Sequence, residues 1–309
     1  MKYIEIQNTN IKASNMVMGN MRLTELSLNE AEKLIKTALD EGINFFDHAD
    51  IYGKDYGKSE ELFAQAIQMN ENIREDMILQ SKCGIQQGGY YDFSKEHIIN
   101  SVDGILERLQ TEYLDILLLH RPDPLMDPEE VGEAFDKLYR SGKVKYFGVS
   151  NFNPAQIELL QKYISQKIII NQLQLSITHT PMIDSGISLN MYIDQAINRD
   201  SSILEYCRLK DITLQAWSPF QNGFFEGPFL GDLEKFPELN KVIDDLAKKY
   251  NVTNTAIAAG WITRHPANIQ VVLGTTNPGR LKDACKGSEI PLTREEWYRI
   301  YKAAGNIVP

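Results

Sequence analysis

Several features that define other protein classes are missing from this sequence of 309 residues. Its three cysteines, Cys83, Cys207 and Cys285, lie far apart and form no Cys-x-x-Cys pair, which argues against a disulfide framework. No stretch approaches the roughly 18 consecutive apolar residues that span a bilayer, and the first residues do not resemble a signal peptide. We therefore expect a cytoplasmic protein that does not enter a membrane.

The sequence also has no excess of basic residues and no phosphate-binding glycine motif. Its formal net charge is -10, whereas a nucleic-acid-binding protein needs a basic face. It contains no Gly-x-Gly-x-x-Gly after a strand, no Walker A motif and no His-Glu-x-x-His. We expect no nucleic-acid partner and no metal, and a Rossmann cofactor site is not indicated.

Short apolar segments alternate with longer amphipathic segments along the chain, which predicts strands and helices in turn. Strands that alternate with helices pair in parallel, because a parallel pair needs a long crossover. Eight such units predict an α/β fold, a (β/α)₈ TIM barrel that occupies residues 1–309 as a single domain. The predicted strands are 17–18, 43–46, 77–80, 114–119, 146–149, 168–170, 212–216 and 269–273. The predicted helices are 28–41, 59–68, 95–109, 128–141, 154–163, 202–210, 238–250 and 255–264.

Individual residues indicate where some helices start and end, and three further segments lie outside the repeated units. Ser59 and the pair Asn153-Pro154 are typical of helix starts, and Gly42 and Gly142 are typical of helix ends. Segments 3–6 and 11–13 predict a hairpin that plugs the bottom of the barrel, and 293–304 predicts an extra C-terminal helix. The long segment 177–201 is expected either to shape the substrate pocket or to contact another subunit.

Polar or functional residues stand where the predicted strands end. Since the active site of a TIM barrel lies at the C-terminal ends of its strands, we expect these residues to share one mouth. They are Asp47, Lys82, His120, Ser150, Asn151, Gln172, Trp217 and Gly274.

Four of the side chains near this mouth predict general acid chemistry. Tyr52 lies five residues beyond Asp47, and a nearby ammonium such as that of Lys82 lowers the pKa of a tyrosine, which is ordinarily about 10. Asp47 would pair with Lys82, and His120 would donate a hydrogen bond to a carbonyl oxygen. Together they could protonate an oxygen while a hydride reaches its carbon. The hydride must come from a cofactor, because no side chain can supply one.

The motifs that carry these residues resemble those of the aldo-keto reductase superfamily, over residues 15–303. They are FFDHADIYG (45–53), SKCG (81–84), LLLHRPDP (117–124), GKVKYFGVSNF (142–152), NQLQLS (171–176) and AWSP (216–219). The histidine after Asp47 and the sequence HRPDP are similar to those of a bacterial branch of poorly characterised oxidoreductases.

This resemblance implies an NAD(P)H-dependent reductase of small carbonyl compounds, with a catalytic tetrad of Asp47, Tyr52, Lys82 and His120. It implies that Ser150, Asn151 and Gln172 hold the nicotinamide carboxamide and that Trp217 stacks on the ring. Ser218 and the loop 220–225 would cover the pyrophosphate. The adenosine end would meet Gly274, Thr275, Thr276, Asn277 and Arg280.

The preference between the two nicotinamide cofactors depends on few residues. Many members of the family that prefer the phosphorylated cofactor have a basic residue where this chain has Gly274. Arg280 remains to bind a 2′-phosphate, with Lys282 as a second candidate, and a guanidinium suits a phosphate well. We therefore expect NADPH rather than NADH.

Three alternatives stay open at this level. Asp50 competes with Asp47 as the partner of Lys82. His48, Asp50 and His120 could ligate a metal in a barrel hydrolase, although an extended chain would turn His48 away from Asp47. The chain could also be a regulatory subunit that senses the cofactor with little turnover, and the sequence does not predict its oligomeric state.

Overall fold

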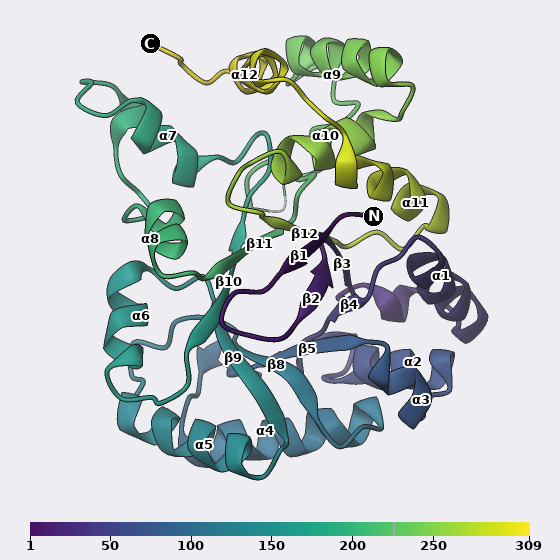
Figure 1. The fold of residues 1–309 in the computed structure, drawn as a ribbon, viewed down its shortest axis with the longest axis vertical. Coiled ribbons are helices and arrows are strands. Elements are labelled where there is room, and N and C mark those ends of the chain that lie inside the picture. The colour runs from purple at the N-terminus through teal and green to yellow at the C-terminus, as the bar shows by residue number, and fades with distance from the viewer. Residues whose placement is uncertain (225) are drawn as a thin grey trace.

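The computed structural model describes residues 1–224 and 226–309, and its centre is a closed barrel of eight parallel strands (Figure 1). Each predicted strand overlaps one of these strands, so the (β/α)₈ barrel is confirmed. In order around the barrel they are β3 (Met16–Gly19), β4 (Phe45–Asp47), β5 (Ile78–Cys83), β8 (Leu114–Leu119), β9 (Val144–Ser150), β10 (Ile168–Gln174), β11 (Thr213–Trp217) and β12 (Gln270–Leu273). The barrel closes because β12 pairs with β3.

Helices between the strands form the outer ring (Figure 1). Those expected from the amphipathic segments are α1 (Leu28–Asp40), α2 (Lys58–Ile67), α4 (Lys95–Leu109), α5 (Pro128–Arg140), α6 (Pro154–Gln161), α8 (Ile203–Leu209), α9 (Pro237–Tyr250) and α10 (Asn254–Thr263). Asn153 starts α6 as predicted, because its side chain accepts a hydrogen bond from the backbone of Gln156 at 2.9 Å. The prediction that Ser59 starts a helix is wrong, since α2 begins at Lys58 and Ser59 donates to the Asn20 carbonyl at 2.6 Å.

The predicted N-terminal hairpin closes one end of the barrel. Its strands β1 (Tyr3–Glu5) and β2 (Lys12–Ser14) are antiparallel. Ile4, Ile6 and Ala13 from the hairpin form one buried cluster with residues inside the barrel, among them Phe45 and Ile78. Because Phe45 and Ile78 are the first residues of β4 and β5, the plug fills the N-terminal end and leaves the polar C-terminal mouth at the opposite end.

The extra C-terminal helix is also confirmed, as α12 (Arg294–Ala303). Short elements that lack a clear hydrophobic period were not predicted. They are α3 (Glu71–Glu75), α7 (Pro181–Ile187), α11 (Pro278–Cys285), the hairpin β6 (Ile85–Gln86) and β7 (Tyr90–Tyr91), and the 3₁₀ turns η1 (Leu23–Glu25), η2 (Asp194–Ala196) and η3 (Lys286–Glu289). The segment 177–201 contains α7 and η2, and Gln195 ties it to the C-terminal tail through the backbone of Ile307, with bonds of 2.9 and 2.7 Å.

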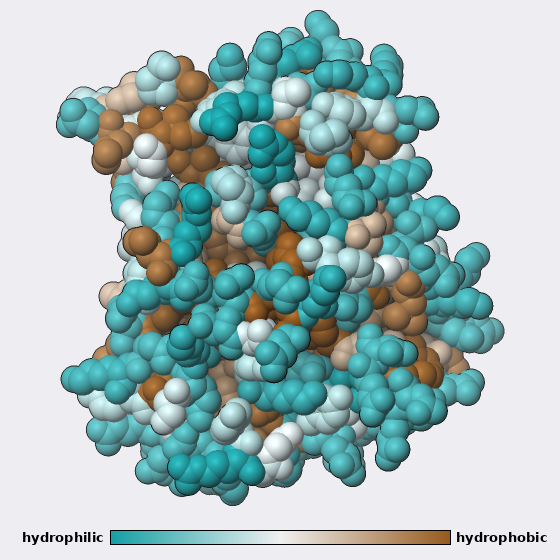
Figure 2. Space-filling model, viewed as in Figure 1, coloured by the Kyte–Doolittle hydropathy of each residue, from teal (hydrophilic) through white to brown (hydrophobic). Residues whose placement is uncertain are grey.

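A second, larger apolar core lies between the outer surface of the barrel and the helices. The face in Figure 2 is mainly hydrophilic, with apolar side chains gathered near α7 at the upper left. Leu189 and Tyr192, which follow α7, are among the exposed apolar residues. None of the helices in the described part of the chain is long and apolar enough to cross a membrane.

Candidate active site

The strand ends bring the predicted residues to one mouth. Asp47 is the last residue of β4, Lys82 is the last but one of β5, and His120 directly follows β8. Ser150 ends β9, and Trp217 ends β11. All of these strands run in the same direction, so their final residues share the end of the barrel opposite the hairpin plug.

Lys82 is the centre of a compact polar cluster. Its ammonium nitrogen lies 2.7 Å from Oδ2 of Asp47, 2.7 Å from the carbonyl oxygen of His48 and 3.2 Å from the hydroxyl of Tyr52. Its side chain is 0% exposed, so this charge is held away from water. Asp47 is therefore the partner of Lys82, and the competition with Asp50 is decided.

Backbone hydrogen bonds hold Tyr52 above β5. The amide of Asp50 donates to the carbonyl of Lys82 at 3.0 Å, which ties the loop directly to that strand. The amide of Tyr52 donates to Ala49 at 3.0 Å, and the amide of Ser59 donates to the Tyr52 carbonyl at 3.1 Å. The phenol is thus positioned by the loop between β4 and α2, with its ring 6.0 Å from the His120 ring in an edge-on arrangement.

Burial changes the acidity of all three groups that face the mouth. Burial disfavours the charge of Lys82, but Asp47 and Tyr52 together raise the pKa of Lys82 above its ordinary value. Burial raises the pKa of Tyr52, although the Lys82 charge acts in the opposite direction as predicted. Burial, followed by the charges of Lys82 and Arg121, lowers the pKa of His120 well below its ordinary value. At neutral pH the site therefore holds a charged lysine, a protonated tyrosine and a neutral histidine.

A layer of glutamines, of which only Gln172 was predicted as a site residue, lies beneath this cluster. Gln80 and Gln172 both donate to Oδ1 of Asp47, at 2.6 and 3.1 Å. Both also donate to Gln215 at 2.9 Å, and Gln215 donates to Gln270 at 3.0 Å. Gln80 stands two positions before Lys82, and alternate residues of a strand face the same side. The alternation of side chains along β5 was therefore sufficient to predict that Gln80 points into the barrel. The layer fixes the carboxylate that holds Lys82.

The remaining polar residues of the motif have separate environments. His48 is buried, with Nε2 3.2 Å from the Asn20 amide and its ring 4.6 Å from the ring of Phe63, so it does not converge with His120. Burial, and then the Glu60 charge, raise the pKa of Asp50 to about 7. Cys83 is fully buried and fills space beside Lys82 as a small packing residue. Within residues 1–224 and 226–309, no group of three or more His, Cys, Asp or Glu side chains is placed to hold a metal ion.

Residues expected at the nicotinamide end form a connected group. Trp217 donates from its indole nitrogen to Oδ1 of Asn151 at 3.1 Å, and Asn151 donates to the Ser150 hydroxyl at 2.8 Å. Ser150 in turn donates to the Gln172 carbonyl at 3.0 Å. Trp217 is half-buried, and Ser218 follows it with a left-handed φ of 50° that turns the chain into the next loop. The last residue of the expected loop 220–225, Phe225, lies outside the described residues.

Residues expected at the adenosine end lie in the loop between β12 and α11. Asn277 caps α11 by accepting from the backbone of Arg280 at 3.0 Å, and Thr275 accepts from the backbone of Asn277 at 3.2 Å. Gly274 and Thr276 belong to the same half-buried loop, and Arg280 is exposed. Arg22, which was not predicted, donates to the Gly274 carbonyl through Nε at 3.0 Å and through Nη2. Nothing in the local sequence around Arg22 indicates that contact.

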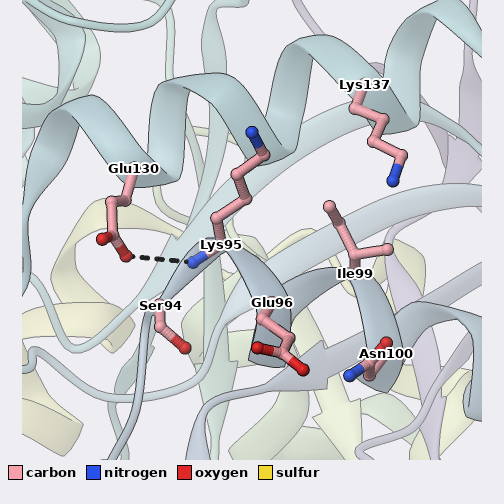
Figure 3. Close-up of a pocket in the computed structure, with 7 residues that line it drawn as sticks. All are labelled: Ser94, Lys95, Glu96, Ile99, Asn100, Glu130 and Lys137. Carbon is pink, nitrogen blue, oxygen red and sulfur yellow. Dashed lines mark hydrogen bonds between the residues drawn. The ribbon is translucent and has the colours of Figure 1, made fainter.

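A surface cavity of about 460 Å³ lies elsewhere, between α4 and α5 (Figure 3). There the backbone amide of Lys95 donates to Glu130 at 3.2 Å, and the Lys95 ammonium pairs with Glu133 at 2.6 Å. These are side chains of the outer helices rather than of strand ends. The cavity is therefore separate from the Lys82 cluster.

Known proteins resemble the chain over almost its whole length. A model of the aldo/keto reductase family matches residues 15–304. The uncharacterised oxidoreductase YcsN of Bacillus subtilis is 35% identical over 305 residues, which are 95% of this chain and 95% of that protein. A 6-dehydroglucose reductase of Agrobacterium fabrum is 33% identical over 307 residues, again 95% of each.

A solved structure agrees with these sequence relatives. A thermostable aldo-keto reductase in complex with the inhibitor epalrestat is 25% identical, covers 98% of this chain and 100% of its own, and has a TM-score of 0.78. The resemblance read from the motifs, including that to bacterial oxidoreductases, is therefore confirmed. This chain belongs to the aldo/keto reductase family of nicotinamide-dependent oxidoreductases.

Proposed function

We propose that this protein uses NADPH to reduce a small aldehyde or ketone to an alcohol, with Tyr52 as the general acid. The observation that carries the proposal is the position of the Lys82 ammonium, 2.7 Å from Asp47 and 3.2 Å from the Tyr52 hydroxyl. A buried cation beside a phenol stabilises the phenolate that remains after proton transfer. We propose further that residues 1–309 act as one cytoplasmic barrel domain.

The residues around the mouth fit a nicotinamide cofactor. Trp217 is half-buried and lies beside the polar side chains of Ser150 and Asn151, and its ring would stack on the nicotinamide. The amide nitrogen of Gln172 already donates to Asp47 and Gln215, so Gln172 would offer the carboxamide its oxygen. A Cβ added at Gly274 would meet no atom within 4 Å, which leaves the start of the adenosine loop open. When bound, the cofactor supplies the hydride.

The residues of the chain supply the proton and the electrostatic support. Tyr52 gives its hydroxyl proton to the carbonyl oxygen of the substrate as negative charge develops there. Neutral His120 donates a ring N–H to the same oxygen, which orients the carbonyl without adding a second cation beside Lys82. Asp47, fixed by Gln80 and Gln172, keeps the Lys82 ammonium in place and balances its charge.

The rate of carbonyl reduction distinguishes a reductase from a regulatory subunit that only senses the cofactor. Wild-type protein should oxidise NADPH in the presence of at least one carbonyl compound from a panel of aromatic aldehydes, dicarbonyls, quinones and 6-dehydroglucose. The last compound is included because one relative is named as a 6-dehydroglucose reductase. The measurement is the loss of nicotinamide absorbance, with cofactor affinity followed separately by protein fluorescence. Tight NADPH binding without turnover of any carbonyl would instead support the regulatory function.

Arg280 should determine the preference for NADPH. It is exposed at the first turn of α11, beside the proposed adenosine loop, whereas Lys282 already pairs with Glu41 at 3.2 Å. Arg280→Ala should raise the KM for NADPH by about 10-fold, as expected for the loss of one charge-assisted phosphate contact, and leave the KM for NADH nearly unchanged. Lys282→Ala is the matched control and should affect neither. An equal rise for both cofactors after Arg280→Ala would show that this residue does not bind a 2′-phosphate.

A further inference from the structure

A second cation, Arg121, lies at the mouth and has no place in the proton-transfer mechanism. It directly follows His120 at the end of β8 and is half-buried. Its guanidinium carbon lies 5.7 Å from the centre of the Trp217 ring. It is close enough to Tyr52 for its charge to oppose the rise in the pKa of that phenol. Arg121 therefore borders the space in which a carbonyl substrate would meet Tyr52.

Among the residues that the structure describes, no carboxylate balances the charge of Arg121. Lys82 pairs with Asp47 at 2.7 Å, and Arg108 pairs with the buried Glu60 at 2.8 Å. By contrast, in the described ranges 1–224 and 226–309 Arg121 has no carboxylate partner and no side-chain hydrogen bond, only its contact with Trp217. Arginine stays charged at physiological pH, and a partly buried charge without a counter-ion is unfavourable. This part of the mouth is therefore positive in a chain whose net charge is -10.

The barrel topology separates Arg121 from the loop that is proposed to hold the adenosine end of the cofactor and its 2′-phosphate. Arg121 follows β8, whereas Gly274 and the loop to Arg280 follow β12. Three strands separate β8 from β12 in each direction around the closed barrel, so the two loops leave opposite sides of the mouth. An anion that pairs with Arg121 is thus better placed on the substrate than on the adenosine end of the cofactor.

We infer that Arg121 selects carbonyl substrates that carry an anionic group, such as a carboxylate or a phosphate. A guanidinium offers a planar set of donors that matches either group through two parallel hydrogen bonds, and partial burial strengthens the attraction. The anion supplies the missing counter-charge, while the carbonyl of the same molecule faces Tyr52 and His120. This inference rests on the proposed carbonyl reduction and adds the substrate class.

Matched substrate pairs test this role. The first pair is 4-carboxybenzaldehyde and its methyl ester, and the second is glyceraldehyde 3-phosphate and glyceraldehyde, so that carboxylate and phosphate are distinguished. Wild-type protein should favour the anionic member of at least one pair. Arg121→Gln should lower kcat/KM for that anionic member by roughly 10- to 100-fold, the range for lost hydrogen bonds to a charged group, and leave the neutral member within about 2-fold. Arg121→Lys, which keeps the charge but not the planar donors, should lie between.

Two controls separate recognition by Arg121 from other effects. Arg140→Gln removes one positive charge from an exposed position at the end of α5, and it should leave kcat/KM unchanged for both substrates of each pair. Folding of each variant is checked by thermal unfolding and by NADPH affinity. Equal losses on charged and neutral substrates, a selective loss of NADPH affinity, or wild-type turnover without preference for the anion would each overturn the role of Arg121. Absence of turnover with every carbonyl, neutral ones included, would overturn the proposed reductase activity as well.

Discussion

Tyr52→Phe should lower kcat for carbonyl reduction by roughly 100- to 10,000-fold, the usual contribution of a positioned general acid. The substitution removes the hydroxyl that lies 3.2 Å from the Lys82 ammonium and keeps the aromatic ring. Neutral His120 would still orient the carbonyl, but the proton would then have to come from water. The binding of NADPH should change little, since Trp217, Asn151 and the β12–α11 loop are untouched.

The measurement compares two tyrosines of one loop. Tyr56 lies in the same connection between β4 and α2 but is 42% exposed, so Tyr56→Phe is the matched control and should keep wild-type kcat. Dissociation constants for NADPH are measured on all three proteins. Loss of NADPH binding together with turnover in Tyr52→Phe would contradict the role of Tyr52 as the acid, because it would point to a damaged cofactor site.

Lys82→Met should reduce kcat to a similar extent, because the phenolate left by proton transfer would no longer face a cation. The substitution also leaves Asp47 buried without its partner, which costs about 3–5 kcal/mol of stability. A decrease in melting temperature is therefore expected together with the loss of activity. Any remaining rate should fall as the pH rises, because Tyr52 loses its proton. This fall should occur at a higher pH than in the wild type, since Lys82 no longer lowers the pKa of the Tyr52 phenol.

A double variant separates the loss of activity from the loss of stability that Lys82→Met is expected to cause. Asp47→Asn combined with Lys82→Met removes both charges, so it should recover much of the lost stability while remaining inactive. Lys54→Met, at an exposed position of the loop that carries Tyr52, is the control for a lysine outside the buried pair. Recovery of turnover in the double variant would show that Lys82 serves stability alone.

The amino-acid sequence by itself determined the architecture and the types of residue at the mouth. Apolar strand segments and amphipathic helix segments are local patterns, and their alternation leaves few topologies for a chain of this kind. Strand direction then places Asp47, Lys82 and His120 at one end, whatever the exact boundaries of β4, β5 and β8. Even the plug was predictable, because two short segments typical of strands precede the first strand of the barrel.

Local sequence patterns did not predict the short elements or the contacts between residues far apart in the chain. The segment between β10 and α8 contains α7, and the β12–α11 loop accepts hydrogen bonds from Arg22, but neither follows from a local period. The glutamine layer joins β5, β10, β11 and β12, whose residues are far apart along the chain. Such contacts depend on barrel closure, which brings these strands together across the interior.

Only the tertiary structure decided the electrostatics of the site. The sequence left Asp47 and Asp50 as competing partners of Lys82, and the distance of 2.7 Å selects Asp47. The sequence predicted a lowered pKa for Tyr52, whereas burial outweighs the effect of Lys82 and raises it. That Arg121 has no counter-ion among the described residues also appears only in three dimensions. Charge interactions depend on distances through space and on exclusion of water, and neither quantity is written in the order of the residues.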